Sequence, residues 1–235
     1  MKLSNLFSPP PFQSRHCKRT FVASPEDEAS QPTREVIEFA LAVVRQTLDV
    51  DVSDVSRRLK STTWRPDTWP GEHYRLLAGL VAHLAPTTIV EIGTLTGLSA
   101  LCLKKYLRPE GKLVTFDLVP WDKVPDSCLV PGDFADGRLS QQLANLAEPD
   151  AFRRHAALLS KADFLFVDGP KDRKFEPAFA ARLDTLAFAK PPWVIFDDIR
   201  DMNMLRFWRE LKKPKLDLSC FGHWTGTGLV YWTAP

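Results

Sequence analysis

The stretch I-V-E-I-G-T-L-T-G-L-S-A, residues 89–100, decides the fold that we expect for this chain. It opens with a β-branched apolar run, passes through Gly93 and Gly97, and continues with leucines and an alanine at helical spacing. This pattern predicts a strand, a tight turn and a helix. Glycine just past a buried strand lets a ligand approach the main chain, and the positive end of the helix points into the same space. The stretch predicts a site for a nucleotide-like ligand, although an ordinary strand-to-helix turn also uses such glycines.

Length and composition bound the class of protein. The chain has 235 residues, enough for one α/β domain with a short extension. Lys and Arg number 31 and Asp and Glu 29, so we expect neither nucleic acid nor a membrane surface as a partner. The four cysteines are scattered without metal-ligand spacing, which is typical of a reducing, cytoplasmic setting. No apolar run approaches the roughly 20 residues that span a bilayer.

The chain divides into three parts by composition and periodicity. Residues 1–32 are rich in proline and polar residues and predict a flexible N-terminal arm. Residues 33–68 predict a helical extension or lid, because residues 36–44 carry an apolar stripe. An aromatic, proline-containing connection around residues 64–71 leads into the main domain, residues 69–235.

Beyond the glycine turn, strand and helix patterns alternate at the spacing of right-handed βαβ units. We therefore expect a doubly wound, mostly parallel α/β sheet, like a Rossmann fold, that ends in an antiparallel hairpin at its edge. The expected strands are 112–117, a weak third strand at 128–130, then 163–168 and 193–197, with the hairpin at 216–221 and 228–233. The expected helices are 33–44, 73–84, a region from Leu139 to Leu159 interrupted at Pro149, 175–189 and 202–211.

Acidic residues stand at or near the expected strand ends. In open α/β sheets, ligands bind beyond the carboxyl ends of the strands, so we expect these acids to line one site. Like charges gathered on one rim repel one another, and a cation should offset them. Asp133 and Asp198 taken singly also suit a capping role. The set comprises Glu91, Asp117, Asp133, Asp168, Asp197 and Asp198.

Two segments carry a resemblance to a known family. E-I-G-T-L-T-G-L-S-A resembles the first motif of class I S-adenosylmethionine-dependent methyltransferases, and Asp117 falls where that family places an acid for the ribose hydroxyls. The segment V-D-G-P-K-D-R, residues 167–173, is similar to the D-x-x-K-D-R segment of catechol O-methyltransferase and its bacterial relatives. Asp197 and Asp198 match the family's second metal-binding segment.

The resemblance runs from about Trp69 to the C-terminus and has two departures. Gly169 and Pro170 replace the bulkier residues that catechol-type enzymes often carry, and residues 1–60 align with nothing in the family. The main domain is thus expected to bind S-adenosylmethionine.

The resemblance implies a magnesium-assisted O-methyltransferase whose acceptor is a small phenol, catechol or sugar hydroxyl. It assigns Lys171 as the general base, with Asp168 as its catalytic partner, and a magnesium ion to Asp168, Asp197 and Asp198. Hard carboxylate oxygens suit magnesium, and a nearby cation with partial burial would favour the neutral form of the lysine. The cofactor-binding residues predicted are Glu91, Gly93, Thr94, Gly97, Ser99, Asp117, Gly132, Asp133 and Asp168.

Other readings stay open at this stage. The same fold without the metal would give a metal-independent methyltransferase or a binding module. A nicotinamide-dependent oxidoreductase ranks lowest, because the turn G-T-L-T-G lacks the G-x-G-x-x-G spacing. His73, His155 and His223 are isolated, and isolated histidines are more often structural than catalytic. Both a monomer and a homodimer are compatible with the sequence, as are several hydroxylated acceptors.

Overall fold

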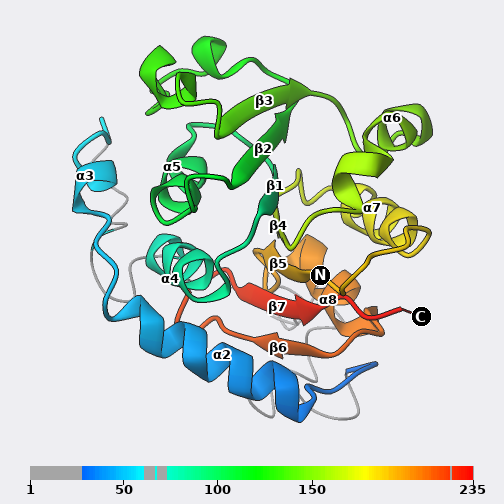
Figure 1. Ribbon diagram of the computed structural model, residues 1–235. Coiled ribbons are helices and arrows are strands. Elements are labelled where there is room, and N and C mark those ends of the chain that lie inside the picture. The colour runs from blue at the N-terminus through cyan, green and yellow to red at the C-terminus, as the bar shows by residue number, and fades with distance from the viewer. Residues whose placement is uncertain (1–27, 61–66, 68–72, 223, 235) are drawn as a thin grey trace, which may run out of the picture.

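The computed structural model describes residues 28–60, 67, 73–222 and 224–234. The expected arm up to residue 27, most of the aromatic connection and His223 lie outside the described residues. In the described part a seven-stranded sheet has the order β3-β2-β1-β4-β5-β7-β6 (Figure 1). The strands are β1 (Thr88–Ile92), β2 (Lys112–Asp117), β3 (Leu139–Leu143), β4 (Phe164–Val167), β5 (Trp193–Asp197), β6 (Lys215–Asp217) and β7 (Thr227–Tyr231).

Helices cover both faces of this sheet. Figure 1 shows α4 and α5 on one face and α6, α7 and α8 on the other, with α2 running along the end near β6. The helices are α2 (Arg34–Thr47), α3 (Ser53–Ser56), α4 (Tyr74–Leu84), α5 (Leu98–Lys105), α6 (Pro149–Leu159), α7 (Phe175–Leu183) and α8 (Met202–Glu210), with 3-10 turns η2 (Trp121–Lys123) and η3 (Pro131–Phe134). No helix in the described ranges combines the length and apolar character needed to cross a bilayer.

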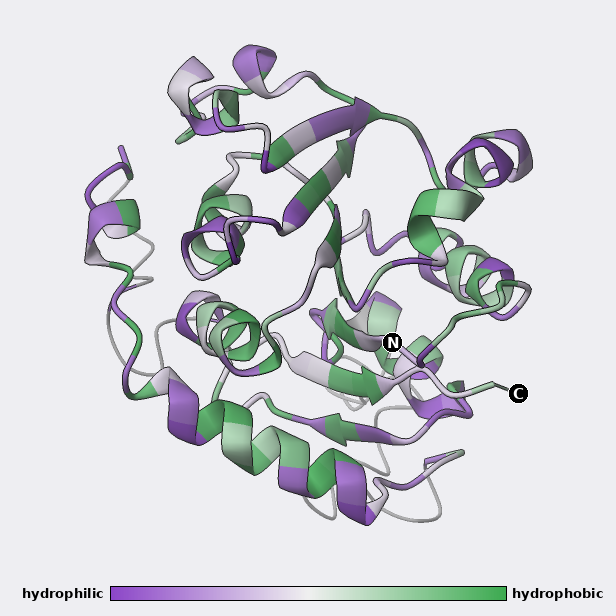
Figure 2. Cartoon of the chain, in the orientation of Figure 1, coloured by the Kyte–Doolittle hydropathy of each residue, from purple (hydrophilic) through white to green (hydrophobic). Residues whose placement is uncertain are grey.

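The central strands are apolar along almost their whole length because both faces are covered. Ile89 and Phe164 belong to the core under α4 and α5, whereas Val90 and Leu165 belong to the core under α6, α7 and α8. Figure 2 shows these strands in green between helices that are purple on their outer faces. The double burial fixes the strand register, and with it the level at which each strand ends.

Most of the expected elements are confirmed. The structure has the predicted strands at β2 and β5 with the predicted bounds, and β4 is shorter by one residue at each end. The C-terminal hairpin is also present: β7 pairs antiparallel with β5 and with β6, which forms the sheet edge. Pro149 begins α6 and does not interrupt a longer helix, as its preset φ suits the first helical position.

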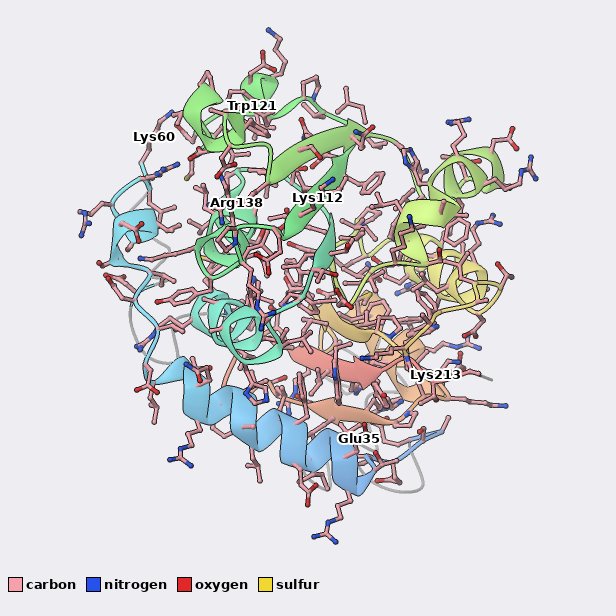
Figure 3. All side chains as sticks on the ribbon, in the orientation of Figure 1. Glu35, Lys60, Lys112, Trp121, Arg138 and Lys213 are labelled. Atoms are coloured by element: carbon pink, nitrogen blue, oxygen red, sulfur yellow. The ribbon has the colours of Figure 1, made fainter. Side chains whose placement is uncertain are left out.

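The expectation for the third strand is wrong. Residues 128–130 form a loop in which the Cys128 N–H donates to the Thr96 carbonyl at 2.8 Å. The third strand is β3, part of the region that we expected to be helical, and it pairs in parallel with β2. Arg138, labelled in Figure 3, anchors its start, because Nη1 donates to the Leu107 carbonyl at 2.9 Å.

Helix α2 is joined to the main body by a close approach to α4. Val36, Ala40 and Val43 on α2 are buried in the core under α4 and α5. Thr47, the last residue of α2, lies directly over Gly79 of α4, where a Cβ would come within 2.5 Å of the Thr47 Oγ1 and 2.9 Å of its Cα. Glycine at this position therefore sets the distance between the two helices.

We expect Gly79→Ala to destabilise the protein, although alanine is the better helix former. The added Cβ would force α2 away from α4, and overpacking of this kind typically costs about 1–3 kcal/mol. Urea denaturation measures the change. Gly132→Ala is the matched control, because nothing lies within 4 Å of the Cβ that it would add. A Gly79→Ala protein as stable as the control would contradict this account of the helix contact.

Candidate active site

Acidic side chains from four strands lie at or near the carboxyl edge of the sheet. β1, β2, β4 and β5 run parallel, so their carboxyl ends share this edge. Glu91 lies in β1, Asp117 ends β2, Asp168 follows β4, and Asp197 ends β5 and is followed by Asp198. The fold thus brings together acids that are far apart in the sequence.

Glu91 is fully buried two residues before Gly93. Burial raises the pKa of its carboxyl to about 7, while the nearby hydroxyls of Ser99 and Thr115 oppose the rise. Neither hydroxyl is placed to donate a well-formed hydrogen bond to this carboxyl, and both Glu91 oxygens are without a hydrogen-bond partner among the described residues. The chain therefore holds an uncompensated acid just before the glycine turn.

The carboxylate of Asp117 is oriented by main-chain amides. Its Oδ1 accepts hydrogen bonds from the Leu118 and Val119 N–H groups at 2.6 and 3.1 Å, and its Oδ2 accepts one from Leu95 at 2.9 Å. Leu95 has a φ of 40°, in the left-handed region. These bonds hold the acid at the end of β2 and leave part of its acceptor capacity for a ligand.

Gly93 and Gly97 accommodate the protein's own atoms. Gly93 has a φ of 96°, and a Cβ on it would lie 2.2 Å from the carbonyl oxygen of Asp168. A Cβ on Gly97 would lie 2.3 Å from the Leu129 side chain. Gly93 also lines the cavity described below. The main reason that it lacks a side chain, however, is that the ends of β1 and β4 approach each other closely at this point.

Thr94 and Ser99, both predicted to bind a cofactor, are buried. The Thr94 and Thr115 hydroxyls share a hydrogen bond of 2.8 Å, and the Gln141 Nε2 donates to Thr94 at 3.1 Å. Ser99 lies in the first turn of α5. In this structure Thr94 thus links β1 to β2 and β3 beneath the turn.

Asp168, Asp197 and Asp198 form a compact cluster of carboxylates. One oxygen of each lies within 4.8 Å of the others. The Lys171 Nζ enters this cluster, 2.7 Å from the Asp198 Oδ2 and 3.9 Å from the Asp197 Oδ2, and it also contacts the Asp168 Oδ1. We call these four residues, the three aspartates and Lys171, the acidic cluster.

The charges of this cluster shift its pKa values. Burial, and next the charge of Asp197, raise the pKa of Asp168 to about 6, while Lys171 opposes the rise. Burial alone would lower the pKa of Lys171, but the surrounding carboxylates outweigh it and raise that pKa. Without a metal the lysine is therefore held as an ammonium ion, and the neutral form that we expected would need another cation at the carboxylates.

The main chain around the cluster is strained. Lys171, Arg173 and Asp198 have φ values of 51°, 69° and 57°, in a region that residues other than glycine rarely occupy. The Lys171 N–H donates to the buried Glu176 Oε1 at 3.0 Å, which helps to hold the turn. Such conformations cost on the order of 1–3 kcal/mol each and tend to gather at functional sites.

The structure brings His73 to the cluster, which the sequence did not indicate. His73 is the N-terminal flanking residue of α4 and is buried, with its Nδ1 3.3 Å from the Asp197 Oδ1. Its ring also lies 5.4 Å from that of Phe166 in β4. Burial lowers the pKa of His73, but the carboxylate of Asp197 outweighs this effect and raises it. An isolated histidine before a helix carries no signal of such a contact.

A cavity of about 690 Å³ adjoins the acidic cluster. Its walls include Asp117 at the end of β2, Asn145 and Glu148 after β3, and Asp168 and Lys171 after β4. This volume lies within the roughly 300–1,000 Å³ of small-molecule sites. Asp168 and Lys171 thus belong both to the cavity wall and to the cluster.

The positions of Gly132 and Asp133 correct the expectation for the third strand end. Both precede β3 and lie outside the cavity wall. The Asp133 carboxylate pairs with the Arg58 Nη1 at 2.7 Å and accepts from the Val130 N–H at 2.8 Å, so it anchors a loop. The polar residues that follow the true β3 are Asn145 and Glu148, and only a correct strand assignment would have found them.

The described residues fit a divalent cation and a nucleoside-type ligand. Asp168, Asp197 and Asp198 offer the hard oxygens that magnesium prefers, and an ammonium group already stands among them as a cation. Asp117 would accept hydrogen bonds from ribose hydroxyls, and Asn145 offers an amide to a base. Asp117, Asn145 and Asp168 line the same cavity, so the two groups of residues meet at Asp168.

Comparison with known proteins gives a structural likeness only. No protein-family model matches the chain, and no curated protein matches its sequence. An O-methyltransferase from Bacillus cereus, solved with S-adenosylhomocysteine, is 20% identical with a TM-score of 0.53, over 80% of this chain and 88% of that one. A methyltransferase from Geobacter sulfurreducens is 19% identical with a TM-score of 0.53, over 69% and 80%.

A further solved structure agrees in fold. The O-methyltransferase TomG from Streptomyces achromogenes, involved in tomaymycin synthesis and solved with S-adenosylmethionine, is 19% identical with a TM-score of 0.51, over 84% of this chain and 90% of that one. At these identities the likeness establishes the fold. The chain has the Rossmann-like fold of class I S-adenosylmethionine-dependent methyltransferases, as the sequence predicted.

We expect the buried Glu91 to make stability fall as pH rises. Its pKa is about 7 in the folded protein and near 4.5 when exposed, so between these values the unfolded chain loses a proton that the folded chain keeps. Glu91→Gln should remove this dependence and raise the free energy of unfolding above the range, by at most about 3 kcal/mol. Urea denaturation across the range measures it.

Glu110→Gln, at an exposed position, is the control and should change little. If Glu91→Gln kept the slope of the wild type against pH, or lowered stability above the range, Glu91 would not be the uncompensated acid that the structure indicates.

Proposed function

We propose that this protein is an S-adenosylmethionine-dependent O-methyltransferase that uses a divalent cation, with magnesium as the natural candidate. The main observation in support of this proposal is that the cavity and the acidic cluster share Asp168 and Lys171. A ligand in the cavity would therefore have its reacting end beside a set of carboxylates suited to a cation. The fold shared with the O-methyltransferases from Bacillus cereus and Streptomyces achromogenes supports this proposal.

The residues divide the chemistry between them. Asp117 would position the cofactor through its ribose, while Asp168, Asp197 and Asp198 would hold the cation. A bound divalent cation supplies Lewis-acid stabilisation of negative charge on an acceptor oxygen. Lys171 would take the proton from the acceptor hydroxyl, because its ammonium loses the carboxylates that stabilise it once they bind another cation.

The acceptor that we propose is a small hydroxylated molecule, such as a phenol, a catechol or a sugar hydroxyl. Methyl transfer to such an oxygen needs the hydroxyl deprotonated and aligned, which a base and a cation at the same point provide. The apolar wall of the cavity, with Phe116 and Phe175, suits a largely apolar ligand with few polar groups.

Metal dependence separates this proposal from a metal-independent methyltransferase. With S-adenosylmethionine and a catechol as a probe acceptor, chelation by EDTA should abolish methyl transfer, and added magnesium should restore it. Asp198→Ala should lower the rate at least 100-fold while leaving S-adenosylhomocysteine affinity within a few-fold, since the residue lies in the cluster and not on the cavity wall. A radiolabelled methyl assay and calorimetry measure the two.

Asp150→Ala is a control outside the cluster, because Asp150 lies exposed in the first turn of α6, where it pairs with the exposed Arg153. Full activity in EDTA would leave the fold unchanged but discard the cation. Calorimetry that showed NADH binding and no S-adenosylhomocysteine binding would discard the methyltransferase itself.

Lys171→Ala tests the general base. A positioned base contributes about 10²–10⁴ in rate, so turnover should fall by that factor at saturating magnesium, where the metal offsets the lost charge. Lys171→Arg should not rescue turnover, because a guanidinium keeps its proton. The wild-type rate should rise with pH through a group that the variants lack, as a pH–rate profile would measure.

S-adenosylhomocysteine affinity serves as the check that Lys171→Ala keeps the cofactor site intact. A variant within a few-fold of wild-type turnover at every pH would leave Lys171 only the role of counter-ion to the carboxylates.

A further inference from the structure

His73 approaches the acidic cluster from a part of the chain remote from the other members. It begins α4, on the face of the sheet opposite α6, α7 and α8, and its side chain is buried against Asp197, itself buried. The two carboxylate oxygens of Asp197 face different neighbours. Oδ1 lies 3.3 Å from the His73 Nδ1, whereas Oδ2 lies 3.9 Å from the Lys171 Nζ.

The two oxygens of Asp197 therefore have different roles. Lys171 stands among the three carboxylates, so the oxygen that faces it is the one turned toward a cation in the cluster. The imidazole contacts the opposite oxygen, and its nitrogens are not among the ligand atoms that lie within 4.8 Å of one another. His73 is therefore placed behind a ligand and not at the ion.

The position of His73 is itself well fixed. Its ring packs against Tyr74 at 4.5 Å and Phe166 at 5.4 Å between centroids, and the helix that it begins is packed on α2 and α5. A rigid imidazole beside a buried carboxylate restricts the rotation of that carboxylate, which is how outer partners orient metal ligands.

We propose that His73 is a positioning residue that holds Asp197 with Oδ2 toward the bound cation and thereby sets the metal affinity of the site. The inference rests on the proposed metal-dependent function. His73 acts through its Nδ1, because that atom faces the carboxylate. Loss of an outer partner of this kind typically weakens metal binding 10–100-fold.

Manganese binding to the full chain tests the proposal without any acceptor. Electron paramagnetic resonance of free Mn²⁺ gives the dissociation constant, and calorimetry with S-adenosylhomocysteine gives the cofactor affinity of the same sample. His73→Phe should weaken manganese binding about 10–100-fold and leave the cofactor affinity within a few-fold. A merely structural role would weaken both together.

Two further variants keep the test decisive if His73→Phe folds poorly. The amide nitrogen of Asn can take the place of Nδ1, whereas that of Gln lies nearer the place of Nε2. His73→Asn should therefore stay within about threefold of the wild type in manganese affinity, and His73→Gln should lose at least tenfold. His83→Phe, at an exposed position near the end of the same helix, should change nothing.

The outcomes separate this inference from the proposed function. If neither the wild-type protein nor the Asp198→Ala variant binds manganese, the proposed metal centre is wrong, and this inference is wrong with it. Wild type that binds manganese while His73→Phe, or both His73→Asn and His73→Gln, bind it equally tightly would overturn the role of His73 alone.

Discussion

Three carboxylates within 4.8 Å of one another repel strongly unless a cation stands among them, and the carboxyl edge of this sheet depends on that requirement. Lys171, whose backbone has a left-handed conformation, meets it in the chain as described by placing its ammonium among the carboxylates. Gly93 serves the same arrangement, because only a residue without a side chain lets Asp168 come so close to the end of β1. The strained backbone at this edge of the sheet therefore accompanies the close placement of the three carboxylates and the lysine.

A cation that enters this site must exchange with the lysine. The carboxylate oxygens that would bind it are those that Lys171 now contacts, so metal binding and release of the ammonium belong to one equilibrium. The consequence is that the raised pKa of Lys171 describes only the metal-free chain. If Lys171 is the base that we propose, it would stay protonated until the site is loaded, and readiness for proton transfer would be coupled to the presence of the metal.

The sequence was sufficient for the parts of the fold with strong local patterns. The apolar runs of β1, β2, β4 and β5 are buried on both faces, and each ends in or near an acid that the fold brings to one edge. β3 was not predicted from the sequence because it is an edge strand with a half-exposed L-S-Q-Q-L pattern. In addition, the leucines at 139, 143 and 146 repeat at the spacing of a helix. The contact of His73 with Asp197 was not predicted because it joins residues more than a hundred positions apart and depends on how α4 packs. Local periodicity contains no information on such a pair.

The ion pair between Glu28 and Lys215 links the start of the described chain to β6, at the point where the lysine ammonium meets the end of α8. Both side chains are buried, 2.9 Å apart, and the Lys215 Nζ also donates to the carbonyls of Arg209 and Leu211 at 3.2 and 3.1 Å. The Ala29 N–H donates to Arg209 as well, at 2.8 Å. A shortened protein that began at Thr33, where the helical pattern starts, would leave a buried ammonium without its carboxylate, at a cost of roughly 3–5 kcal/mol. The folding unit therefore begins earlier than composition suggests, and a residue that looks like part of a tail supplies the counter-charge for a buried lysine of β6.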